Sequence, residues 1–194
     1  SEDGQPSNQI LMISRVSKTG AFVFIPNKYI ASDATNVFAI DGFSIFSVLQ
    51  SNFHIPYAWE HSSKLKGDLR YSPSDCFETF PLPDLLEYRK EIEDAGKKYH
   101  ALRSEIMKSK RIGLTALYTL YHDHNIREEK VDEMRQLKID MDKLIAKTYE
   151  WADIEYKHGF YEVPYLPDND NVRFTVCEIA RRELLNRFSE LNRM

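Results

Sequence analysis

Short apolar and β-branched runs separated by polar turn residues occupy the first part of the chain, a pattern typical of strands rather than helices. The sequence predicts four strands in the following places: residues 10–16, 22–25, 29–31 and 36–40. A Lys-Thr-Gly turn separates the first two, and an Asp-Gly turn follows the last.

The period of the apolar positions changes to a helical one over residues 43–61, where Phe46, Leu49, Phe53 and Tyr57 recur every three or four residues. Pro56 lies inside this stretch and is expected to kink the helix or split it in two. Residues 62–83 carry glycine and several prolines without a regular period. We therefore predict an irregular segment there that ends the first part of the chain.

Two long apolar seams follow, one within a helix predicted for residues 84–109 and one between Val131 and Trp151. Gly96 is a weak point in the first helix. Helices with a short connection are expected to pack as an antiparallel hairpin. Residues 152–172 read as a long loop, and the Thr175-Val-Cys-Glu178 pattern predicts a capping box that opens a last helix.

These elements predict an α+β fold that is mostly α. A small β-rich part comes first, and a helical bundle with a long antiparallel helix hairpin follows. The expected division of the chain is residues 1–83 and residues 84–194.

Composition places the chain among ordinary globular proteins, with 42% hydrophobic and 29% charged residues. A net charge of −4 argues against non-specific coating of nucleic acid, although a local basic patch could still read DNA. Cys76 and Cys177 fit no metal spacing and are expected to be free thiols in a reducing compartment. No apolar run is long enough to span a bilayer, so we expect a cytoplasmic protein without a membrane partner.

The motifs of several enzyme classes are absent from the sequence. It has no glycine-rich cofactor or phosphate loop and no Asn/Asp-Pro-Pro-Tyr/Phe segment to hold a flipped base. His122 and His124 could ligate a metal but have no third ligand, so a turn role is the simpler interpretation. Glu128 and Lys130 could belong to a nuclease pattern, but solvated charges at a helix start explain them better. We predict no catalytic and no metal-binding residue.

An ordered series of soft motifs resembles the end of the target recognition domain, and the helical domain after it, in type IIG and MmeI-like restriction–modification DNA methyltransferases. The motifs include residues 43–51, 69–83, Gly113-Leu114-Thr115, Tyr121-His122-Asp123, Tyr149-Glu150-Trp151 and 180–192. The family more often has Tyr-Gly-Trp at the fifth of these places. Each motif alone is weak, and the resemblance rests on their order and spacing.

The resemblance implies a non-catalytic recognition module of a longer DNA (adenine) methyltransferase, which also cleaves DNA in many family members. It implies double-stranded DNA and the methyltransferase domain of the same parent chain as partners. S-adenosylmethionine would be bound by that missing domain, and no cofactor by this chain. The alternative is a purely structural helical scaffold that docks the recognition domain or a partner chain.

The resemblance also suggests two base-reading residues, Lys66 and Asp68, because the family carries a charged pair just ahead of the segment that begins at Leu69. A lysine can donate to guanine O6 and N7, and an aspartate can accept from cytosine N4. Gly67 between them would let the backbone approach DNA closely. Solvated loop charges are the competing interpretation.

Basic residues near the pair and on the first long helix could contact the DNA backbone, which positions a protein without reading sequence. These candidates are Lys64, Arg70, Lys97, Lys98, Arg103, Lys108, Lys110 and Arg111. Arg70 could instead pair with Asp75 and fix the loop. For the helix residues, solvation of a charged face is the competing interpretation.

Overall fold

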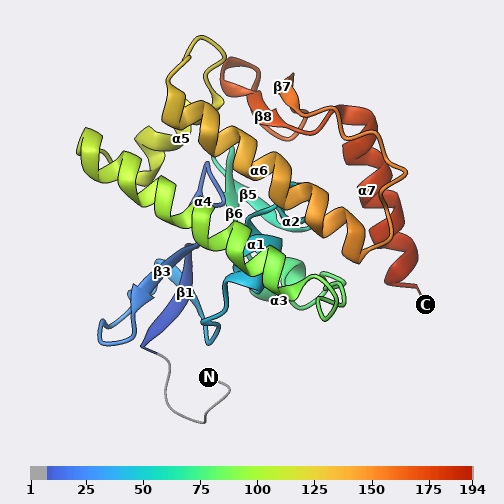
Figure 1. The fold of residues 1–194 in the computed structure, drawn as a ribbon, viewed down its shortest axis with the longest axis horizontal. Helices are drawn as coiled ribbons and strands as arrows, with labels where there is room; N and C mark the ends of the chain where they lie inside the picture. Colours follow the sequence, from blue (N-terminus) through green and yellow to red (C-terminus); the bar gives the residue numbers. More distant parts are fainter. Residues whose placement is uncertain (1–7, 194) are drawn as a thin grey trace.

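The computed structural model describes residues 8–193 of the chain (Figure 1). Its first sheet has the strand order β3-β1-β4, with all pairs antiparallel. The strands are β1 (Gln9–Ser14), β3 (Val23–Pro26) and β4 (Thr35–Phe38). The strand predicted at residues 29–31 is wrong, because Tyr29 and Ile30 lie on an exposed loop, where Ile30 is 99% exposed and packs on nothing.

Two strands of a second small sheet lie in the region predicted to be irregular. Its strand order is β2-β6-β5, and both pairs are antiparallel. The strands are β2 (Val16–Ser17), β5 (Ser63–Leu65) and β6 (Asp68–Arg70), and a short helix, α3 (Pro73–Cys76), follows. Strands of two or three residues are too short to show a hydrophobic alternation, which is why the sequence did not reveal them.

The helical stretch after the first sheet is split in two, as the proline predicted. Helix α1 (Phe43–Gln50) ends at Ser51, and α2 (His54–His61) begins after Phe53. Pro56 lies in the first turn of α2, where its missing N–H is not needed by the helix. The break between the two helices therefore lies at residues 51–53, ahead of Pro56 rather than at it.

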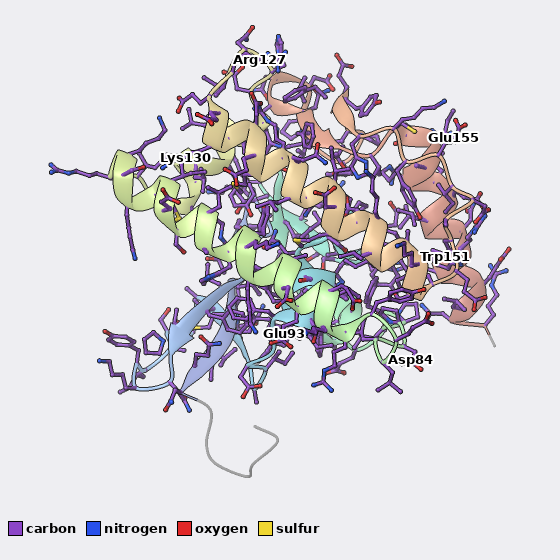
Figure 2. All side chains as sticks on the ribbon, viewed as in Figure 1. Asp84, Glu93, Arg127, Lys130, Trp151 and Glu155 are labelled. Atoms are coloured by element: carbon purple, nitrogen blue, oxygen red, sulfur yellow. The ribbon has the colours of Figure 1, made fainter. Side chains whose placement is uncertain are left out.

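The long helix hairpin is confirmed. Helices α4 (Arg89–Lys110) and α6 (Glu129–Thr148) run antiparallel and pack along their length, and α5 (Leu114–His122) connects them (Figure 1). In Figure 2, Lys130 marks the start of α6 and Trp151 follows its end. Much of the apolar seam of each helix is buried, including Tyr99 and Ile106 on α4 and Met134 and Met141 on α6.

The C-terminal part contains a strand pair that the sequence analysis read as a loop. Strands β7 (Gly159–Glu162) and β8 (Val172–Thr175) flank a 3₁₀ turn, η1 (Asp168–Asp170), and α7 (Glu178–Leu191) ends the fold. The capping box is wrong, since Cys177 is the N-cap of α7 and Thr175 belongs to β8. The Glu178 carboxylate binds Arg181 and Arg182 instead, at 2.6 and 2.7 Å.

One hydrophobic core joins the β-rich and helical parts of the described chain. Phe22 and Phe46 from the first part share it with Tyr99 and Met141 from the second. The predicted division between residues 83 and 84 therefore remains a prediction, because the packing is continuous across it. Within residues 8–193, every helix is too short or too polar to cross a bilayer.

Candidate nucleic-acid interface

The β5–β6 hairpin presents both predicted base-reading residues at its tip. Leu65 and Asp68 are the last paired residues, so Lys66 and Gly67 alone form the turn. Their φ angles are +53° and +87°. Positive φ at both central residues is the signature of a type I′ turn, which matches the twist of the flanking strands. Asn-Gly and Asp-Gly are the usual sequences of such a turn, so Lys66-Gly67 did not predict a hairpin.

The two side chains leave the hairpin at different places. Lys66 is exposed at the turn, whereas Asp68 is half-buried at the start of β6. Within residues 8–193, neither side chain forms an ion pair or a hydrogen bond. A cation and an anion therefore lie close together at the β5–β6 turn without partners in the described chain.

Alternation along β6 separates an outer face from a buried one. Leu69 is 1% exposed and packs into the core, while Asp68 and Arg70 point to the other side. Arg70 is exposed and makes no ion pair with Asp75 in the described structure, so the proposed loop-fixing pair does not form. Instead it borders a shallow hollow of about 220 Å³ together with Arg15, which the sequence analysis did not single out.

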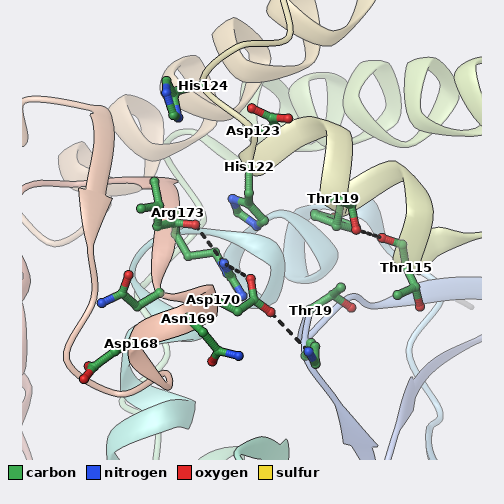
Figure 3. A pocket seen from close by; sticks show the side chains of 14 residues that line it. Thr19, Thr115, Thr119, His122, Asp123, His124, Asp168, Asn169, Asp170 and Arg173 are labelled. Atoms are coloured by element: carbon green, nitrogen blue, oxygen red, sulfur yellow. Dashed lines mark hydrogen bonds and ion pairs between the residues drawn. The ribbon is translucent and has the colours of Figure 1, made fainter.

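The C-terminal part supports the hairpin turn. A Cβ built on Gly67 would lie 3.4 Å from Pro167 Cγ, so the residue before η1 rests against the turn. Next to it, Asp170 binds Lys18 and Arg173, each at 3.1 Å (Figure 3). These residues line one side of a cleft of about 340 Å³, and His122 and Thr119 line another (Figure 3).

The basic residues predicted on α4 fall into three groups. Lys98, Lys108 and Arg111 are exposed and form no ion pair within the described chain. Lys97 binds Glu93 at 2.6 Å, and Lys110 binds Glu128 at 2.5 Å.

Arg103 is the exception to the predicted phosphate contacts. It is 1% exposed and donates to Phe22 O at 2.7 Å. Its guanidinium also reaches Gln50 Oε1 and Tyr118 Oη, at 3.4 and 3.5 Å. Since a buried guanidinium that satisfies core acceptors cannot reach a phosphate, Arg103 is corrected to a structural residue.

Comparison with known proteins shows which protein family the part of the chain with this hairpin resembles. Residues 3–84 match the family model described as "MmeI, target recognition domain". This part of the chain is therefore similar to the target recognition domain of MmeI. The match contains both small sheets, the α1–α2 pair and the Lys66–Asp68 hairpin.

Two further likenesses extend past residues 3–84. The chain is 31% identical over 107 residues to a protein of Bacillus subtilis (strain 168) named DNA methyltransferase A. That match covers 52% of this chain and 12% of the relative, so the chain spans about an eighth of the relative's length. The fold is also similar to that of the Type IIL restriction-modification enzyme MmeI, solved in complex with DNA. The TM-score is 0.68 at 23% identity, over 98% of this chain and 22% of that one, which shows a shared fold for the helical part as well.

The groups first weighed as catalytic or metal-binding are used elsewhere in the structure. His122 Nδ1 accepts a hydrogen bond from the Phe174 N–H at 3.1 Å, and burial holds the pKa of His122 well below its usual value. Lys130 forms an ion pair with Glu105. Residues 8–193 contain no cluster of three metal-ligating side chains. In the described residues, His122 and Lys130 therefore hold parts of the fold together.

Proposed function

We propose that this chain is the DNA sequence-recognition module and helical C-terminal domain of a restriction–modification DNA (adenine) methyltransferase, and that it has no catalytic activity by itself. The observation that carries the proposal is the unpaired Lys66 and Asp68 at the tip of a hairpin inside the matched target recognition domain. Hydrogen bonding to base edges requires donors and acceptors that no other group of the protein already occupies.

The pair complements both partners of a G·C base pair in the major groove. Lys66 can donate to guanine O6 and N7, and Asp68 can accept from the cytosine N4 amine. A good base contact of this kind is worth roughly 1–3 kcal/mol of discrimination. The type I′ turn supports the assignment, because its tight backbone places the lysine at the extreme end of the hairpin.

Phosphate contacts would come from the basic residues around this hairpin and on α4. The candidates that the structure leaves without an acidic partner in residues 8–193 are Lys64, Arg70, Lys98, Lys108 and Arg111. Lys97 and Lys110 remain candidates that would exchange Glu93 and Glu128 for phosphate. Such contacts set the orientation of the protein but not its sequence preference.

Catalysis would belong to a methyltransferase domain in a longer parent chain, which is the second proposed partner after double-stranded DNA. S-adenosylmethionine would bind in that domain, since this sequence lacks a glycine-rich cofactor loop and the base-holding segment. A methyl-transfer assay on residues 1–194 with labelled S-adenosylmethionine should give no product. Turnover by this chain would contradict the proposal.

The decisive experiment sequences the methylated sites made by the intact parent and by a parent with Lys66→Glu and Asp68→Arg. We expect the preferred base to change at one position of the site. A matched control exchanges another lysine–aspartate pair, Lys143→Glu with Asp140→Arg, on the exposed face of α6. An unchanged site in the first variant, with activity retained, would remove the base-reading assignment.

A structural role for the helical part is the second candidate, and the shared core favours it there. Helix α4 packs on α1 of the target recognition domain along much of its length. If the helical part only holds the domain in place, neutralising Lys98, Lys108 and Arg111 together should leave DNA affinity of the parent unchanged even at low salt, where phosphate contacts are strongest.

A further inference from the structure

The outer face of the small β2-β6-β5 sheet brings a second lysine close to Asp68. Strands β2 and β6 pair antiparallel, with Val16 opposite Arg70 and Ser17 opposite Leu69. Continued one step past the end of β2, this register would bring Lys18 opposite Asp68. Val16 pairs with Arg70, which shares its face of β6 with Asp68, and Lys18 follows directly after the end of β2 on the same edge of this sheet.

A lysine and an aspartate in this relationship normally form a cross-strand ion pair. Here the pair is not made. The Lys18 ammonium instead binds the carboxylate of Asp170, at 3.1 Å, across a sequence separation of 152 residues. Asp68 consequently keeps its carboxylate free of any partner in the described chain.

Asp170 is itself fixed by two further contacts (Figure 3). Arg173, whose side chain is 11% exposed, binds the other carboxylate oxygen at 3.1 Å. The Asp170 N–H donates to Pro167 O at 2.9 Å, and Pro167 rests against Gly67 of the hairpin turn. The segment 167–173 therefore touches the small sheet at two places, the end of β2 and the β5–β6 turn.

From this geometry we infer that Asp170 is a positioning residue for DNA reading: by binding Lys18 it keeps the Asp68 carboxylate unpaired and available to a base. The inference rests on the proposed function and deepens it, because it assigns part of the specificity to the C-terminal segment. Asp170 itself contacts no base in this scheme.

Asp68 and Asp170 are alternative partners for the Lys18 ammonium. A surface lysine–aspartate pair is weak, so Lys18 goes to whichever carboxylate is better placed and better supported. Arg173 supports Asp170 from a half-buried strand position, while Asp68 has no such support. Partial burial alone would raise the pKa of Asp170, but hydrogen bonds from Arg173 and Lys18 keep it below its usual value, so the carboxylate is charged at neutral pH.

Without Asp170, the Lys18 ammonium would be free to pair with Asp68, the carboxylate that the continued register brings opposite it. A cytosine N4 amine would then compete with an ammonium for the same lone pairs. Lys18 would also add a cation beside the reading hairpin, and a cation attracts phosphate regardless of base sequence. Both effects lower discrimination at the base pair that Asp68 faces.

The test uses the intact parent enzyme and compares methylation rates on duplexes that carry each of the four base pairs at the position altered by the Lys66→Glu, Asp68→Arg exchange. In Asp170→Asn we expect the preference at that position to fall by roughly tenfold, the range of one lost base contact. Adding Lys18→Gln to Asp170→Asn should restore it, because the competing ammonium is gone. Lys18→Gln alone should keep the wild-type preference.

A matched control is Asp168→Asn, two residues away on η1, where the exposed carboxylate has no ion pair in the described structure. It should leave the preference unchanged. If Asp170 only stabilises the loop, the double variant will be as relaxed as Asp170→Asn, and the inference is overturned. If the Lys66–Asp68 exchange changes the site but Asp170→Asn keeps full preference, the inference fails while the proposed function stands. If the Lys66→Glu, Asp68→Arg exchange leaves the methylated site unchanged, both the base-reading assignment and the inference about Asp170 are wrong.

Discussion

Asp142 accepts hydrogen bonds from both the backbone amide and the side-chain amide of Asn52, at 2.9 and 2.7 Å. Asn52 lies in the break between α1 and α2, and Asp142 is fully buried on α6. His158 Nε2 lies 2.7 Å from the same carboxylate, and Thr175 Oγ1 donates to Asn52 Oδ1 at 3.0 Å. This network joins the recognition half to three separate parts of the helical half.

Removing the carboxylate at the centre of this network should be strongly destabilising. We expect Asp142→Ala to cost roughly 3–5 kcal/mol, because breaking a buried polar pair leaves its partners dry and unsatisfied. Urea unfolding of residues 1–194 measures the loss. Asp140→Ala on the exposed side of the same helix is the control and should stay near wild type; similar losses in both variants would contradict the central role of Asp142.

Gly96 is expected to be indispensable for packing rather than a weak point in α4. A Cβ at this position would lie 2.2 Å from Ser47 Oγ and 2.7 Å from Phe43 O, so α1 and α4 touch here. Gly96→Ala should destabilise the protein by about 1–3 kcal/mol, the usual cost of overpacking, although alanine favours helix. A thermal melt checks this against Gly113→Ala, where an added Cβ meets nothing within 4 Å.

Because Arg103 is buried and Lys108 is exposed, replacing each of them by glutamine should affect the stability of the protein differently. Arg103→Gln should lower the melting temperature, because Phe22 O loses its donor at 2.7 Å inside the core. Lys108→Gln should leave the melting temperature unchanged. If Lys108 binds a phosphate, the same variant of the intact parent should release about one counterion fewer on DNA binding, so its DNA affinity should depend less on salt concentration. A normal melting temperature in Arg103→Gln would refute its structural assignment.

His100 should make the protein sensitive to mild acid. Burial, and to a lesser extent the charge of Arg103, lowers its pKa from 6.5 to about 4. The unfolded chain therefore binds a proton between pH 6.5 and 4 that the folded chain does not. The stability contribution is complete above pH 6.5 and is lost as the pH falls toward 4.

His100→Phe isolates this contribution, since a phenyl ring can keep the contacts with Phe24, Phe43 and Phe46. The wild type should lose about 1–2 kcal/mol more than the variant between pH 6.5 and 4, less than the full pKa difference because the ring is partly solvated. Urea unfolding at a series of pH values measures it. Parallel pH profiles for the two proteins would rule out His100 as the source.

The sequence by itself determined the helical elements, because an apolar seam is a property of neighbouring turns. Tyr99 and Ile106 on α4, and Met134 and Met141 on α6, lie on the predicted seams and are buried. Pro56 correctly placed a break between two helices. The ordered motifs were sufficient to identify the target recognition domain, which the family match over residues 3–84 bears out.

Only the tertiary structure decided which polar residues are free to bind. Arg103 and Lys108 are five residues apart on one helix, yet the first is enclosed by acceptors from α1, α5 and the residue before β3, and the second is exposed. Lys18 and Asp170 lie at opposite ends of the sequence, and folding makes them partners. Burial and long-range ion pairs depend on segments that lie far apart in the sequence, so no local sequence pattern predicts them. The lack of a partner for the Asp68 carboxylate is therefore a property of the fold.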